Sequence, residues 1–235
     1  RAALGGRNRR EQRHDATILG AFRRKSTRPR DPHRNTLGAR HAHGDHTRPI
    51  GQRRALHARI VAAMEKHYAE RLPEHAERLA RHAIQGELWS QAVAHSHAAA
   101  VKAAARSAYR DAVAHLEEAL ASLARLPETP DRLAHAIDLR LALRSSLFPL
   151  GQIARDLDNL KEAEALALRL DDRRRLGWIL AYMIRDFSIL GMPDQSIEQG
   201  QRALALVPEV GDLELEMLIN GYLGSVCFAR GDYRR

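Results

Sequence analysis

The chain has 235 residues, of which 44% are hydrophobic and 29% charged, as in an ordinary soluble globular protein. No apolar run approaches the ~20 residues that span a bilayer, so we expect no membrane partner; the single cysteine excludes an internal disulfide and fits a reducing, cytoplasmic compartment. The net charge of +9 lies in residues 1–50, which hold 13 Lys and Arg against 4 Asp and Glu, whereas residues 51–235 hold 25 of each sign.

Residues 1–51 form a basic segment dominated by Arg, His, Gly, Pro and Thr. The segment has almost no aliphatic residues, so it cannot bury enough apolar area to offset the entropy of ordering, and we predict that it is disordered. Its arginines could bind nucleic acid, but interleaved aromatic residues and a recognition fold are missing, so we do not favour a nucleic-acid partner. We favour the interpretation that GC-rich coding DNA is read out of frame up to the composition change near Gln52.

The sequence HAHGDH in this segment contains possible metal ligands. Its donors are His41, His43, Asp45 and His46, with His33 nearby, and they could bind zinc or nickel. A metal site needs a scaffold that holds its ligands, and the surroundings here are arginine-rich and without periodicity. We therefore predict no metal and no other cofactor.

From Gln52 onward the apolar residues recur at helical spacing, and no stretch alternates as a half-buried strand does. The clearest apolar stripes lie at residues 56–64, 76–84, 109–123 and 176–187. We therefore predict that residues 52–235 are all-α.

An internal period of about 40 residues runs through the second half of the chain, a length typical of helical repeats. Gly151, Gly191 and Gly231 are evenly spaced at this period. The same offset relates Ala163 to Ala203, Leu166 to Leu206 and Asp172 to Asp212. Two helices and two turns in each period predict a helical solenoid, with glycine where the chain leaves the first helix and alanine where the second helix crosses its neighbour closely.

The details of each unit resemble tetratricopeptide repeats. The first helix carries Leu223-Gly224, the turn reads Gly-Asp-Tyr, and the second helix has a large residue followed three positions later by alanine. This second-helix pattern occurs at Trp89 with Ala92 and at Tyr109 with Ala112. The period exceeds the roughly 34 residues of the standard repeat, so longer helices or connections are expected.

Two prolines mark expected helix ends, and the end of the chain falls inside an expected helix pair. Pro127 and Pro208 are expected just after second helices, because proline cannot continue a helix. The last predicted helix has barely begun when the chain stops, so we expect the repeat region to be truncated.

No active site is predicted in the helical part. Glu117-Glu118 and Asp171-Asp172 are interpreted as exposed acids, residues 173–175 as a solvated helix start, and Cys227 as a small buried hydrophobe. The histidines, which show no metal-ligand spacing, are interpreted as helix-surface residues. They are His57, His67, His75, His82, His95, His97, His115 and His135.

Five stretches closely resemble bacterial multidomain signalling proteins. They are RRALHARIVAAMEKHY (53–68), HAERLARHAIQGELWSQAV (75–93), KAAARSAYRDAVAHLEEAL (102–120), AIDLRLALRSSLFPLG (136–151) and GQRALAL (200–206). Such proteins carry an N-terminal class III adenylate/guanylate cyclase domain, a central nucleotide-binding ATPase module and a long C-terminal tetratricopeptide region. The cyclase aspartates and the ATPase phosphate loop are missing here, so the resemblance transfers no catalytic residue and implies a fragment that keeps a sensing or assembly portion.

Two functions are compatible with this resemblance. The first is a non-catalytic scaffold that binds a protein or peptide partner, or packs on the ATPase module of its own parent. The alternative is a repeat fragment of an ATPase-type transcriptional regulator, which a DNA-binding helix-turn-helix outside this chain would reveal.

The partner groove is expected on the first helix of each pair. Counting back from the turn glycines places Asp138, Leu141 and Ser145 on one such helix, and Trp178, Ala181, Arg185 and Ser188 on the next. A large aromatic residue beside an arginine is typical of binding hot spots, and this favours Trp178 as a contact residue. The alternative is that Trp178 caps the interface between adjacent repeats.

Overall fold

The computed structural model describes residues 50–231, which belong to one unit, Pro49–Arg235. All regular structure among the described residues is helical, which confirms the predicted all-α class. The predictions for the basic segment and for the HAHGDH ligands concern residues outside the described range, except that Ile50 and Gly51, at the end of the segment predicted to be disordered, begin a helix. None of the described helices is both long enough and apolar enough to cross a membrane.

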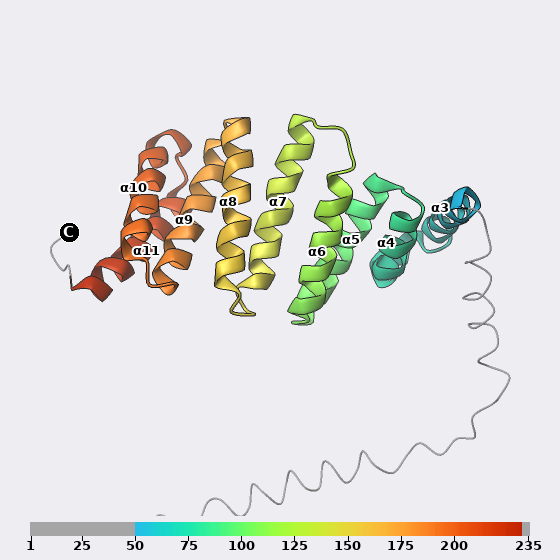
Figure 1. Ribbon diagram of the computed structural model, residues 1–235, viewed down its shortest axis with the longest axis horizontal. Coiled ribbons are helices and arrows are strands. Elements are labelled where there is room, and N and C mark those ends of the chain that lie inside the picture. Colours follow the sequence, from blue (N-terminus) through green and yellow to red (C-terminus); the bar gives the residue numbers. More distant parts are fainter. Residues whose placement is uncertain (1–49, 232–235) are drawn as a thin grey trace, which may run out of the picture. The chain divides into compact units, whose positions relative to one another are not determined.

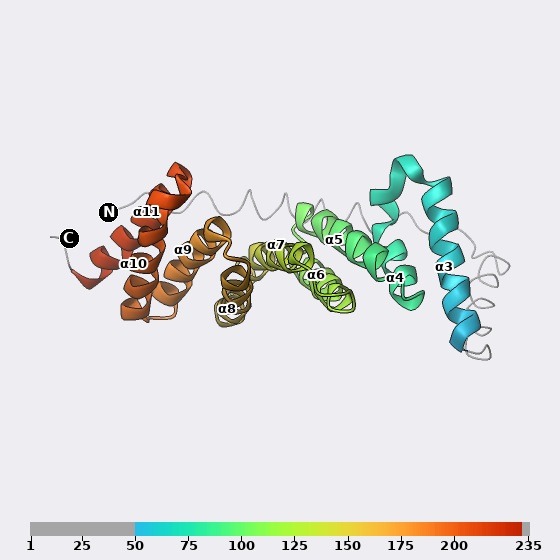
Figure 2. The ribbon, with the colours of Figure 1, turned by 90° about the horizontal axis from the view of Figure 1, so that it is seen from above.

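The described helices follow one another in chain order, each α-helix packing on the next (Figure 1). They are α3 (Ile50–His67), the 3₁₀ helix η1 (Ala69–His75), α4 (Ala76–Gln85), α5 (Trp89–Ala105), α6 (Tyr109–Leu123), α7 (Pro130–Leu147), α8 (Ile153–Leu170), α9 (Arg173–Ile189), α10 (Pro193–Val210) and α11 (Leu213–Arg230). Seen from above, α7, α9 and α11 lie in one layer, whereas α6, α8 and α10 lie in the other (Figure 2).

Ion pairs link alternate helices within each layer. Arg175 of α9 reaches back to Asp138 of α7 at 2.8 Å, and Arg174 reaches forward to Asp212 before α11 at 3.2 Å. In the other layer, Arg155 of α8 pairs with Glu117 of α6. The arginines at the start of α9 were expected to be solvated, and Arg173 and Arg174 are exposed, whereas Arg175 is half-buried between its two acidic partners.

The turn glycines have the left-handed backbone that the repeat period predicts. Gly151 and Gly191 follow α7 and α9 with φ of 69° and 73°, and Gly231 follows α11 with φ of 76°. A side chain at these positions would strain the backbone, which explains why glycine recurs there. Asp172 and Asp212 cap α9 and α11 by accepting hydrogen bonds from backbone N–H groups three positions later.

Small residues allow close packing between the helices. Ala163 and Ala203 are completely buried, as their repeat positions predict. At Gly200 of α10, an added Cβ would lie 2.8 Å from Cγ of Leu223, so glycine permits α11 to approach. The core around these residues runs continuously from α7 to α11.

Two details differ from the expected repeat plan. Pro208 lies inside α10 instead of after it, because the helix continues to Val210 and stops only at Gly211, whose φ is 64°. Trp89 and Tyr109 begin α5 and α6, which are consecutive helices that pack on each other. The two second-helix patterns are only half a period apart, so they do not mark second helices of two successive units.

Candidate functional site

Two arginines and three aromatic rings alternate along the layer of α7, α9 and α11. We call the set Arg144, Phe148, Tyr182, Arg185 and Tyr222 the arginine–aromatic ladder. The guanidinium carbon of Arg144 lies 3.8 Å from the ring centre of Tyr182. That of Arg185 lies 3.4 Å from the ring centre of Phe148 and 5.7 Å from that of Tyr222. Each arginine of one helix thus contacts an aromatic ring of the next helix in the layer, in cation–π geometry.

Beneath the ladder lies a buried carboxyl pair, Asp156 of α8 and Asp186 of α9. Both residues are 0% exposed, and Arg144 is 8% exposed. Nε of Arg144 is 3.9 Å from Oδ2 of Asp156, which is an ion-pair distance too long for a hydrogen bond. Within the described part of the chain, the four carboxyl oxygens and Nε and Nη2 of both ladder arginines are buried, and no hydrogen bond from an N–H or O–H group of a residue outside the pair reaches the oxygens. The two carboxyl groups bond each other through the proton that one of them holds.

The electrostatics of the carboxyl pair favour a retained proton. Burial, and next the negative charge of Asp186, raise the pKa of Asp156 to about 7, while Arg144 opposes them. Burial also raises the pKa of Asp186, against the two arginines. Two carboxylates in one dry site cannot both ionise readily, so one of them keeps a proton to near neutral pH.

The predicted groove residues divide between surface and core. Ser145 is exposed on α7, and Asp138 is exposed but engaged by Arg175. Leu141 is half-buried against the core, and Ala181 is 0% exposed, so Ala181 cannot offer its side chain to a partner. Ser188 is half-buried at the end of α9. Of the predicted set, Arg185 belongs to the ladder.

Trp178 lies between α9 and the start of α11. Its indole Nε1 donates to Oδ2 of Asp212 at 3.3 Å, and its ring centre is 5.8 Å from that of Tyr182. The side chain is half-buried against the core. These contacts correspond to the alternative in which Trp178 caps the interface between adjacent repeats.

Sequence reasoning missed six members of the site, namely Arg144, Phe148, Asp156, Tyr182, Asp186 and Tyr222. Charged residues at helical spacing are normally solvent-facing, and nothing in the local pattern marks these as buried. One signal was available, because Tyr182 and Tyr222 are one period apart and so occupy equivalent positions of the repeat.

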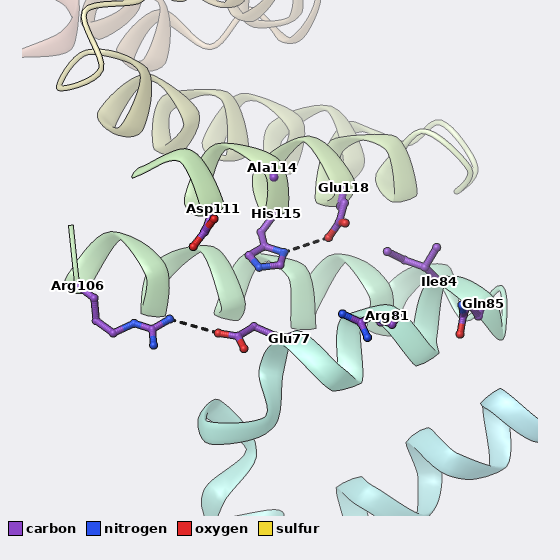
Figure 3. A pocket seen from close by; sticks show the side chains of 9 residues that line it. All are labelled: Glu77, Arg81, Ile84, Gln85, Arg106, Asp111, Ala114, His115 and Glu118. Carbon is purple, nitrogen blue, oxygen red and sulfur yellow. Dashed lines mark hydrogen bonds and ion pairs between the residues drawn. The ribbon is translucent and has the colours of Figure 1, made fainter. Parts of the chain in front are cut away.

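A depression of about 550 Å³ lies over α5 between α4 and α6, away from the ladder (Figure 3). Arg106 spans it to reach Glu77 at 3.3 Å, and His115 bonds Glu118 at 3.1 Å. Its charged groups are largely exposed and several already pair with one another, so they offer little unsatisfied hydrogen-bonding capacity. The ladder and its carboxyl pair are the stronger candidate site.

The expectation that the histidines lie on the surface is wrong for two of them. His57 is buried with its Nδ1 2.9 Å from Nδ1 of His82, and the two rings stack. His95 is buried and its Nε2 is 2.9 Å from Oε1 of Glu65. The rings of His57 and His95 can both be buried because each has a polar partner on another helix.

Among residues 50–231, no three His, Cys, Asp or Glu side chains are grouped as a metal site requires. Cys227 is half-buried on α11, more exposed than the fully buried position expected.

No protein-family model matches the chain, and a comparison with curated proteins finds no match either. Functional assignment therefore depends on the geometry of the site and on the sequence resemblance described above.

Proposed function

We propose that this chain is a non-catalytic scaffold that binds a protein or peptide partner through the layer formed by α7, α9 and α11. The tetratricopeptide-like repeat supports the proposal, because stacked helical hairpins present an extended surface rather than a closed catalytic cleft. The resemblance to cyclase–ATPase signalling proteins supports a partner that is a signalling protein or the ATPase module of the parent.

The arginine–aromatic ladder is the observation that carries the proposal. Arginine and aromatic residues dominate binding hot spots, because they combine a large contact area with directional hydrogen bonds. In the ladder, Tyr182 and Tyr222 are one period apart, and these two rings and Arg185 lie at half-exposed positions along one layer. A peptide lying across α7, α9 and α11 could contact all three.

Peptide selection on the immobilised full chain tests this proposal. Short peptides enriched from a display library would be measured by fluorescence anisotropy against two matched variants. Ser145→Tyr adds a bulky side chain at an exposed position of α7, in the proposed binding layer. Ala165→Tyr adds the same side chain at an exposed position of α8, in the other layer. We expect the first variant to weaken binding about 5-fold or more and the second less than about 2-fold.

Two results would contradict the scaffold proposal. One is failure to enrich any peptide that binds the folded chain. The other is binding that weakens with Ala165→Tyr and not with Ser145→Tyr, which would place the contact surface on the other layer. Helical circular dichroism of both variants controls for misfolding.

A further inference from the structure

An exposed row of apolar and small residues runs along α11, on the side opposite its core contacts. We call it the outer row of α11, and it consists of Leu213, Met217, Asn220, Gly221, Gly224 and Phe228. These positions recur at i, i+4, i+7, i+8, i+11 and i+15, so they share one face of the helix. Leu213, Met217 and Phe228 are 68%, 67% and 71% exposed. Large apolar side chains gathered on one exposed face indicate a contact surface.

The equivalent face of α9 is an interface between successive repeats. The repeat offset relates Met217 to Gly177 and Gly221 to Ala181. Both α9 residues are buried, and a Cβ added at Gly177 would lie 2.7 Å from Cδ2 of Leu215 on α11. α11 is the last described helix of the stack (Figure 2), so no described helix follows to cover its outer row. The outer row therefore continues an interface that the fold already uses for packing one helix on the next.

The outer row is complementary to itself in the antiparallel orientation. Met217 and Gly224 are equally far from the midpoint of the row, and so are Leu213 and Phe228. When two copies of α11 pair antiparallel about this midpoint, Met217 of each copy lies opposite Gly224 of the other. A Cβ added at Gly224 would meet no atom within 4 Å, so this position can receive a large side chain. Such a contact is isologous, with the same surface used by both copies.

The polar groups of α11 favour the same orientation. Asn220 lies beside the midpoint of the row and is exposed. Its amide carries both a donor and an acceptor, so two copies can exchange hydrogen bonds across a two-fold axis and fix the register. The first turn of α11 carries Glu214 and Glu216, and the last turn carries Arg230. Antiparallel pairing brings the acidic end of each helix to the basic end of the other and opposes the two helix dipoles.

We propose that the outer row of α11 is a homodimer interface, in which α11 of two copies packs antiparallel about a two-fold axis beside Asn220. A helix of 18 residues is about 27 Å long, so a contact along one of its faces is small for a specific interface and should be reversible. The inference goes beyond the proposed scaffold function, because Tyr222 of the ladder packs on the core side of α11.

Sedimentation equilibrium of the full chain tests the inference. We expect a reversible equilibrium between monomer and dimer, with a dissociation constant of about 10 to 100 µM. Raising the salt to about 0.5 M should change this constant less than about 3-fold, because the contact is mainly apolar. Association through the arginines of the basic segment would instead weaken steeply with salt.

Two matched substitutions locate the contact. Met217→Lys places a charge in the outer row and should weaken dimerisation at least about 10-fold, since the ammonium group would lose water without gaining a partner. Leu168→Lys makes a similar change on α8, at a side chain that is 55% exposed, and should leave the dissociation constant nearly unchanged. Both positions are exposed, so helical circular dichroism should be preserved in both variants.

Disulfide cross-linking tests the orientation, in a Cys227→Ser background. Gly221→Cys lies beside the proposed axis and should link readily to its own copy in the second chain. Glu214→Cys should not, because its two copies would be about 20 Å apart along the helix axis. A parallel pair of helices would link both variants equally, and a head-to-tail contact with another part of the chain would link neither.

Several outcomes overturn the inference. These outcomes are a chain that remains monomeric at about 200 µM, equal weakening by Met217→Lys and Leu168→Lys, or either alternative pattern of cross-linking. None of them bears on the scaffold proposal, whose peptide binding is measured on the layer that contains Ser145.

Discussion

Single residues at the turns set the spacing of the helices. Gly191 has φ of 73°, and a Cβ added there would meet no atom within 4 Å. Its requirement for glycine is therefore a matter of backbone conformation alone. Gly221, inside α11, is exposed and equally open, but its backbone is helical. The same substitution at these two positions should have opposite effects.

Gly191→Ala should destabilise the protein by about 1 kcal/mol, because alanine is strained in the left-handed region. Gly221→Ala should stabilise it by about 0.5 to 1 kcal/mol, because alanine loses less backbone entropy in a helix. Urea unfolding followed by circular dichroism measures both changes. A shift of both midpoints in one direction would show that backbone conformation does not decide these positions.

The residue scale also shows what local patterns predict and what they do not. The turn glycines were predicted because a left-handed turn imposes a local requirement that recurs once in every period. Trp178 was ambiguous, because the same aromatic pattern serves either a partner or Asp212 on the next helix. Arg144 and Asp156 have the sequence pattern of surface charges, and they are buried only where α7, α8 and α9 pack together.

At the scale of elements, the contact between α10 and α11 depends on one close approach. A methyl group at Gly200 would lie 2.8 Å from Cγ of Leu223, so α11 would have to move or Leu223 change rotamer. Gly200→Ala should therefore destabilise the protein by about 1 to 3 kcal/mol, as overpacking does. Guanidinium unfolding would give the free energy of each variant.

A double-mutant cycle separates this contact from helix propensity. Leu223→Ala removes the side chain that the new methyl group would meet, so the double variant should be more stable than the sum of the two single changes by at least about 0.5 kcal/mol. Additive effects would mean that Gly200 matters for some reason other than the approach of Leu223.

The alternation of first and second helices follows the predicted period from α7 onward, but not at the start of the described unit. From α7 onward, first and second helices alternate at the predicted period, and ion pairs between alternate helices reinforce the layers. Before α7, Trp89 and Tyr109 begin consecutive helices, so a motif for a second helix does not determine which layer a helix joins. Layer assignment depends on contacts between helices, which a short motif does not encode.

For the whole molecule, the carboxyl pair links stability to pH. The pKa of Asp156 rises from an ordinary value of 3.8 to about 7 on folding, chiefly because the group is buried. Between about pH 4 and pH 7, the folded protein therefore keeps a proton on this group that the unfolded chain has already released. Stability from this group is largest at the acid end of that window and is lost as the pH rises through it.

Melting temperatures at pH 5.0 and pH 7.5 test this linkage. The wild-type protein should lose more stability across this interval than Asp156→Asn, whose side chain remains neutral throughout, and each kcal/mol of difference should shift the melting temperature by about 2 to 4 °C. Asp158→Asn, at an exposed position on the same helix, is the matched control and should follow the wild-type profile. An Asp156→Asn profile parallel to that of the wild type would mean that the pair is ionised in the folded protein.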